Sequence, residues 1–142
     1  MAKIRLPAKM EHLEELLDFV DNEAHKAGFS ARRISEIRLA AEEVMVNISC
    51  YAYPETDGDV FVSCFVAEGF FVLEILDSGT PFNIVAAPGP DVGSSCLSER
   101  YVGGLGIHFV KEMATETRYV RDKGQNRLTL IFGKYRQAQI LL

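Results

Sequence analysis

Two polar side chains one helical turn apart are the first residues in this sequence that could do chemistry. Glu43 and Asn47 lie four residues apart in a segment predicted to be helical, so their side chains are neighbours on one face. With Glu36 they form a second polar stripe, flanked by apolar residues, on a helix that needs only one polar face. We interpret this stripe as a carboxylate and an amide that face a cleft. The alternative is that the stripe is solvated and that the apolar residues beside it are partly exposed.

Two further motifs lie at the ends of predicted elements. Residues 77–83 (DSGTPFN) follow an apolar strand, and residues 103–106 (GGLG) precede a helix. Taken singly, Asp-x-Gly is a common turn and a glycine cluster is a common flexible joint. Glycines before a helix can also bring backbone amides to phosphate oxygens. This cluster is neither a P-loop nor a dinucleotide-binding fingerprint, because no Lys-Ser/Thr pair follows it and no strand directly precedes it.

Hydrophobic periodicity predicts the elements that must position these motifs. The sequence predicts helices over residues 10–27, 30–51 and 104–114, and strands over residues 4–6, 60–66, 70–76, 117–121 and 127–132. Residues 78–103 have no periodicity, and so long a loop inside a compact domain tends to be functional. The order of the elements predicts an α+β fold, a two-layer sandwich in which helices cover one face of a mostly antiparallel sheet. We expect residues 1–142 to form a single domain.

Composition narrows the classes of function. The 142 residues carry 15 Lys and Arg against 20 Asp and Glu, a net charge of -5, which weighs against a nucleic-acid binder. The start has no signal-peptide pattern, and no run of about 18 apolar residues could span a membrane. Cys50, Cys64 and Cys96 are widely spaced and predict no disulfide framework, which favours a reducing, cytoplasmic location. A catalytic Cys–His pair stays open, because such partners meet only in the fold.

Together, the order and spacing of the motifs resemble the ATP-binding domain (Bergerat-type fold) shared by sensor histidine kinases, gyrase B, Hsp90 and MutL. The resemblance covers nearly the whole chain, through the segments LAAEEVMVNISCYAYP, LDSGTPFN, ERYVGGLGIHFVKEMA and NRLTLIFGK. The short length makes the chain most similar to the anti-sigma-factor serine kinases of the RsbW and SpoIIAB type.

The resemblance implies roles for the residues of the helix and of the first loop motif. Asn47 matches an asparagine that ligates Mg²⁺, and Glu43 matches a glutamate proposed as general base for a serine hydroxyl or a water. Asp77 matches the aspartate that accepts a hydrogen bond from the adenine amino group. Gly79 would let the backbone lie against the base. Tyr51 departs from the family, whose relatives often have His at this position, so the strength of the activity is open.

The resemblance also implies a nucleotide lid over about residues 78–103. The glycines implied to close it are Gly103, Gly104 and Gly106. Arg100 is expected to contact the γ-phosphate. The alternative is that Arg100 is a solvated residue of the lid without such a contact. Thr129 matches a strand threonine that touches the adenine site. The alternative is that Thr129 is a β-branched residue with a purely structural role in its strand.

The function that the resemblance implies is an ATP- and Mg²⁺-dependent protein serine/threonine kinase that acts as an anti-sigma factor. It would phosphorylate an anti-anti-sigma antagonist of the STAS type, bind a sigma factor and form a homodimer. One alternative is a non-catalytic ATP-binding switch, in which the order of the lid controls partner binding. Another is a detached catalytic module of a histidine kinase, which ranks last for want of a dimerisation helix pair.

Overall fold

The computed structural model describes residues 1–83 and 105–135. The elements in chain order are β1 (Ala2–Pro7), the 3₁₀ turn η1 (Met10–His12), α1 (Leu13–Lys26), α2 (Ala31–Tyr51), β2 (Asp59–Ala67), β3 (Phe70–Asp77), α3 (Leu105–Met113), β4 (Glu116–Asp122) and β5 (Gln125–Phe132). Each predicted element is present, with ends shifted by a few residues. The largest change is at the start of the first predicted helix, where η1 precedes the α-helix.

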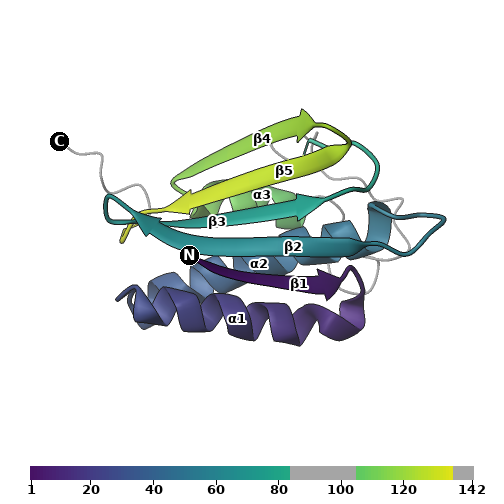
Figure 1. Cartoon of the computed structure of the whole chain (residues 1–142). Coiled ribbons are helices and arrows are strands. Elements are labelled where there is room, and N and C mark those ends of the chain that lie inside the picture. Colours follow the sequence, from purple (N-terminus) through teal and green to yellow (C-terminus); the bar gives the residue numbers. More distant parts are fainter. Residues whose placement is uncertain (84–104, 136–142) are drawn as a thin grey trace.

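The strands form one five-stranded sheet in the order β1-β2-β3-β5-β4. Every neighbouring pair is antiparallel. Figure 1 shows the three helices on one side of this sheet, which gives two layers. The predicted α+β fold, with helices on one face of an antiparallel sheet, is confirmed.

Local chemistry explains where the main elements begin and turn. The Ser30 side chain caps α2, since its hydroxyl oxygen accepts a hydrogen bond from the Arg33 amide at 3.1 Å. The β2–β3 turn has two consecutive residues with positive φ, Glu68 at 53° and Gly69 at 85°. The β4–β5 turn repeats this with Lys123 at 51° and Gly124 at 79°. Two positive φ angles match the twist of tight antiparallel hairpins, so both turns favour the observed strand pairing.

The core lies between the sheet and the helices. Because side chains alternate across a strand, one face of each central strand is buried. The strand residues of the core cluster are Leu6 of β1, Val60, Val62 and Cys64 of β2, Phe71, Leu73 and Ile75 of β3, and Leu128, Leu130 and Phe132 of β5. From the helix side, the i, i+4 pattern of α1 places Leu16, Val20 and Ala24 against them. This alternation also decides which residues of β3 and β5 can face a ligand on the helix side of the sheet.

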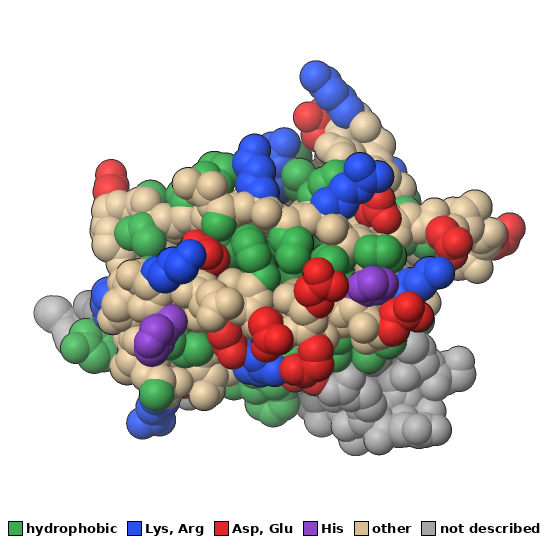
Figure 2. All heavy atoms as spheres, turned by 60° about the horizontal axis from the view of Figure 1, so that its bottom comes forward, with side chains coloured by type: hydrophobic (Ala, Val, Ile, Leu, Met, Phe, Trp, Pro, Cys, Tyr) green, Lys and Arg blue, Asp and Glu red, His purple; other side chains and the backbone are tan. Residues whose placement is uncertain are grey.

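Acidic side chains gather on the helical layer over α1 (Figure 2). The acids of this helix are Glu14, Glu15, Asp18, Asp21 and Glu23. Arg38 of α2 reaches across to them, with Nη1 2.7 Å from an Asp21 oxygen and Nη2 3.1 Å from a Glu14 oxygen. This acidic face therefore repels a polyanion. The net negative charge of the sequence likewise argues against nucleic-acid binding.

Two further features concern the helices and the cysteines. In the part of the chain that the structure describes, no helix is both long enough and apolar enough to cross a membrane. Cys64 is a free and buried thiol. Cys50 is disulfide-bonded, which the wide spacing of the cysteines did not predict.

Candidate functional site

A pocket opens at the end of the sheet where β3 ends and β5 begins, between the C-terminal half of α2 and the sheet. Its apolar lining comes from Val44, Ile48, Ala52, Ile75, Pro81, Phe82 and Leu128. Its polar lining comes from Asn47, Tyr51, Asp77, Thr80, Tyr119 and Asn126. Mostly apolar walls with a few convergent polar groups are typical of a small-molecule site.

Asp77 is the buried carboxylate of this pocket, with 5% of its surface exposed. It ends β3, and its Oδ1 accepts a hydrogen bond from the Gly79 amide two residues later at 2.9 Å. This bond forms an Asx turn, which is the local reason that the strand stops here. Oδ1 also accepts a bond from Asn126 Nδ2 at 2.9 Å, while the described residues donate no hydrogen bond to Oδ2. One carboxylate oxygen is therefore held and the other is left for a donor in the pocket.

Only a glycine fits at position 79, because the backbone of Ala52 lies too close to leave room for a side chain. A Cβ at this position would overlap the carbonyl oxygen of Ala52 and lie 2.5 Å from the Ala52 Cβ. The Thr80 amide donates to the same Ala52 oxygen at 2.8 Å, so the turn lies directly on the C-terminal end of α2. Contact with a helix end is therefore one reason for this glycine, and its expected contact with the base stays a prediction.

Glu43 and Asn47 lie on the helix side of the pocket. Asn47 lines it and is half-buried, whereas Glu43, one turn earlier, is 6% exposed and does not line it. Val46, in the apolar stripe beside them, is fully buried. The alternative of a solvated stripe is therefore wrong for Glu43, and the structure keeps the predicted carboxylate and amide together next to the pocket.

Thr129 does not line the pocket. In β5 the buried residues are 126, 128, 130 and 132, so Thr129 lies on the opposite face, paired with Glu74 of β3 and Arg118 of β4. The expectation that Thr129 touches the adenine site is corrected for this reason. Asn126 and Leu128 occupy the pocket side of the strand instead.

Part of the predicted lid lies outside the described residues. Arg100, Gly103 and Gly104 fall there, as does most of the segment 78–103. Gly106 is the second residue of α3. The roles of these residues stay predictions.

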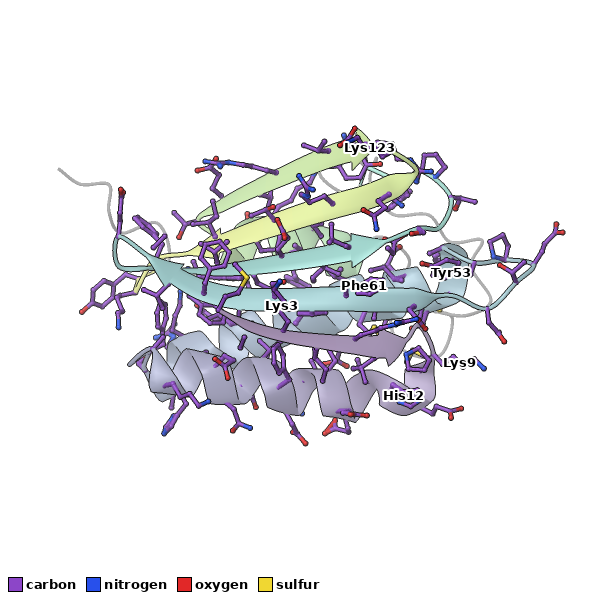
Figure 3. The ribbon with its side chains drawn as sticks, viewed as in Figure 1. Lys3, Lys9, His12, Tyr53, Phe61 and Lys123 are labelled. Carbon is purple, nitrogen blue, oxygen red and sulfur yellow. The ribbon has the colours of Figure 1, made fainter. Side chains whose placement is uncertain are left out.

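Sequence reasoning missed two residues that support Asp77. Asn126 is a buried polar residue on the inward face of β5, and this inward position in the alternating strand pattern was a signal that could have identified it. Tyr53 follows α2 and has no comparable signal. Its hydroxyl donates to the Asp59 carbonyl at 2.8 Å and accepts from the Ser78 amide at 2.7 Å, which holds the turn after Asp77. Burial raises the pKa of Tyr53, and Figure 3 shows its ring at the end of the sheet where β3 ends.

Comparison with known proteins finds a matching domain family and several relatives. A model of the histidine kinase-like ATPase domain matches residues 6–132. The serine-protein kinase RsbW of Listeria monocytogenes is 28% identical over 137 residues, which cover 93% of this chain and 85% of that protein. The serine-protein kinase RsbW of Bacillus cereus is 24% identical over 140 residues, which cover 96% and 86%.

A solved structure supports the fold alone. The RsbU and RsbW domains of a Mycobacterium tuberculosis protein superpose with a TM-score of 0.61 at 15% identity, over 94% of this chain and 32% of that chain. The family match spans most of the sequence, including the helix with Glu43 and Asn47 and the strand end with Asp77. The chain belongs to the histidine kinase-like ATPase domain family.

Proposed function

We propose that this protein is an ATP-dependent protein serine kinase of the anti-sigma-factor type. The observation that carries the proposal is the buried Asp77 carboxylate, which has one oxygen free of described donors in a pocket also lined by Asn47. A carboxylate accepts hydrogen bonds and matches the exocyclic amino group of adenine. The apolar side chains Ile48, Ile75 and Leu128 suit the faces of a flat base.

Asn47 fits the role of a magnesium ligand. Its amide oxygen is a hard, neutral donor, and Mg²⁺ in nucleotide sites takes most of its other ligands from phosphates and water. When bound, the ion would neutralise charge on the β- and γ-phosphates. The half-buried position of Asn47 on the pocket wall leaves its side chain accessible from the pocket.

Glu43 is proposed as the general base. It would take the proton of the serine hydroxyl as the serine oxygen bonds to the γ-phosphorus and ADP leaves. Its place one helical turn from Asn47 puts the base next to the proposed metal ligand. The proposal also includes the lid. Its residue Arg100 would contact the γ-phosphate, and the lid would be closed by Gly103, Gly104 and Gly106.

The partners in the proposal come from the relatives. The RsbW proteins are named serine-protein kinases, and the chain covers about 85% of their length. We propose the same partner-switching role here, with a STAS-type antagonist as substrate, a sigma factor as the second partner and a homodimer as the working form. A single domain over residues 1–142 and a cytoplasmic location are part of the proposal. Because disulfides are rare in reducing compartments, a free Cys50 thiol in protein purified under non-reducing conditions would support this location, and a disulfide at Cys50 would count against it.

The test is phosphate transfer from ATP and Mg²⁺ to the candidate antagonist, with ATP affinity measured alongside. Glu43→Gln should lower the transfer rate by about 10²- to 10⁴-fold, the usual contribution of a general base, and leave ATP affinity nearly unchanged. Glu42→Gln is the matched control, because it makes the same chemical change one residue earlier on α2 and should retain transfer. Wild-type protein that binds ATP but transfers no phosphate would refute the kinase.

The second candidate function is the non-catalytic ATP-binding switch. It is favoured by one observation, the presence of Tyr51 on the pocket wall at the position where the family resemblance implies His. Under this function ATP would change partner binding, and Glu43→Gln would change neither ATP affinity nor partner binding. A detached histidine kinase module would instead produce an acid-labile phosphohistidine.

A further inference from the structure

Asn126 pairs with Asp77 across the sheet, although the two residues are 49 positions apart. The register of β3 and β5 sets them opposite each other, and each is 5% exposed. Asn126 Nδ2 donates to Asp77 Oδ1 at 2.9 Å and to the Thr80 carbonyl at 2.9 Å. Both donor hydrogens of the amide are thus used on the segment that ends at the pocket.

The orientation of this amide is determined by its other neighbours. Asn126 Oδ1 accepts from the Tyr119 hydroxyl at 2.5 Å and from Arg121 Nη1 at 3.2 Å. It also lies 3.4 Å from the Phe82 amide. A guanidinium can only donate, so an amide with its nitrogen turned toward Arg121 would lose that bond and face a cation. Arg121 therefore keeps the Asn126 oxygen away from Asp77 and the nitrogen toward it, and the Tyr119 hydroxyl adds a second hydrogen bond to that oxygen.

This arrangement makes the two oxygens of Asp77 unequal. Oδ1 is held by Gly79 and Asn126, which stops the carboxylate from rotating about its terminal torsion, a soft two-fold torsion in a free side chain. Oδ2 keeps its lone pairs for a donor in the pocket. A purine that presents an amino group there gains a hydrogen bond, whereas one that presents a carbonyl oxygen meets a carboxylate that cannot turn away.

We propose that Asn126 is a positioning residue that sets the purine selectivity of the pocket by reserving Asp77 Oδ2 for a 6-amino group. The proposal rests on the proposed function, in that the pocket must bind ATP. Arg121 supports this role, because it disfavours the amide flip that would turn the Asn126 oxygen toward Asp77 Oδ1 and remove the hydrogen bond that holds that oxygen. Selectivity for adenine thus depends on β4 and β5 as well as on the aspartate itself.

The experiment compares nucleotides that differ at one position of the base. Dissociation constants of ATP, GTP and purine riboside triphosphate, which lacks the 6-amino group, are measured for wild-type protein. Wild type should prefer ATP over purine riboside triphosphate by about 10- to 100-fold, the range for a hydrogen bond to a charged group. Asn126→Leu should weaken ATP by at least about tenfold and purine riboside triphosphate by less than about threefold, so the preference collapses.

Two further variants keep the test decisive. Tyr119→Phe removes only the hydroxyl that holds the Asn126 oxygen, and should reduce the preference for ATP by about threefold even if Asn126→Leu fails to fold. Thr129→Val is the matched control, because it alters the outward face of the same strand and should leave every affinity unchanged.

The outcomes separate this inference from the function on which it rests. Wild-type protein that binds no ATP would refute the proposed function, and with it this inference. Wild-type protein that prefers ATP, with variants that keep the same preference, would refute the positioning role alone. Equal weakening of both nucleotides in Asn126→Leu would show a merely structural role and also overturn it.

Discussion

Gly79→Ala is the substitution for which the structure gives the sharpest prediction. The added Cβ would overlap the Ala52 carbonyl oxygen and lie 2.5 Å from the Ala52 Cβ and 2.6 Å from the Ala52 carbonyl carbon. Two of these three atoms, the carbonyl oxygen and the carbonyl carbon, belong to the backbone at the end of α2. The third, the Ala52 Cβ, is bonded directly to that backbone. No side-chain rotation can therefore relieve the contact, and the turn at residues 78–80 must move instead.

The size of the effect follows from the distances. Non-bonded carbons need about 3.5–4.0 Å, so the turn must shift by about 1 Å or more. The Thr80 amide lies 2.8 Å from the Ala52 oxygen and the Ser78 amide lies 2.7 Å from the Tyr53 hydroxyl, so such a shift breaks these hydrogen bonds. Two lost hydrogen bonds cost about 2 kcal/mol, and residual crowding adds about 1–3 kcal/mol. We expect the free energy of unfolding to fall by about 3–5 kcal/mol, a large part of the about 5–15 kcal/mol typical of a domain.

Urea denaturation followed by circular dichroism measures this loss, and an ATP titration measures the site. Gly69→Ala is the control, because a Cβ there meets nothing within 4 Å but the residue has a φ of 85°. It should cost only about 1–2 kcal/mol, the strain of a left-handed residue, and it lies in the β2–β3 turn, outside the pocket. If Gly79→Ala were no more destabilised than Gly69→Ala and kept ATP affinity, the close approach to α2 would not position Asp77.

Two other predictions concern buried groups outside the pocket. Arg33, which is 2% exposed, donates to the Gly133 carbonyl at 2.8 Å, the Met113 carbonyl at 2.7 Å and a Glu36 oxygen at 2.8 Å. Arg33→Met should therefore lower the free energy of unfolding by about 3–5 kcal/mol in urea denaturation, because buried acceptors lose their donor; a loss below about 1 kcal/mol would contradict this. Burial raises the pKa of Cys64 to about 12 from its ordinary value of 9.0, so the folded state holds this proton more tightly than the unfolded state. Its contribution to stability is complete below about pH 9 and is lost as the pH rises toward about 12, and Cys64→Ala should flatten the decline over this range in denaturation curves.

Much of the framework of this site follows from local patterns in the sequence. The Ser30 cap, the apolar spacing of α1 and α2 and the two-residue turns at Glu68–Gly69 and Lys123–Gly124 determine which segments become helices and hairpins. These signals act over a few residues, and local propensity with hydrophobic periodicity is enough to predict them. The i, i+4 spacing of Glu43 and Asn47 likewise places a carboxylate and an amide on one helix face, whatever the packing around that helix.

The wall of the pocket opposite that helix was not predictable in this way. Thr129 and Asn126 are both polar residues of one strand, and a one-residue shift in register exchanges the faces of all its side chains. The structure places Asn126 inside and Thr129 outside because β5 buries Leu128, Leu130 and Phe132 against the helices. A match of motif positions carries no information about this alternation unless the inward residues of the strand are first identified.

What the sequence alone determined is therefore the set of elements, the α+β class and the helix pair Glu43 and Asn47. Only the tertiary structure decided that Asp77 has one held oxygen and one open oxygen, because its partner Asn126 is 49 residues away. Only the tertiary structure assigned Gly79 to the end of α2, since that contact joins segments that are 27 positions apart. Both depend on contacts between distant segments, which form when antiparallel pairing and core packing fix the register, and no local propensity encodes such contacts.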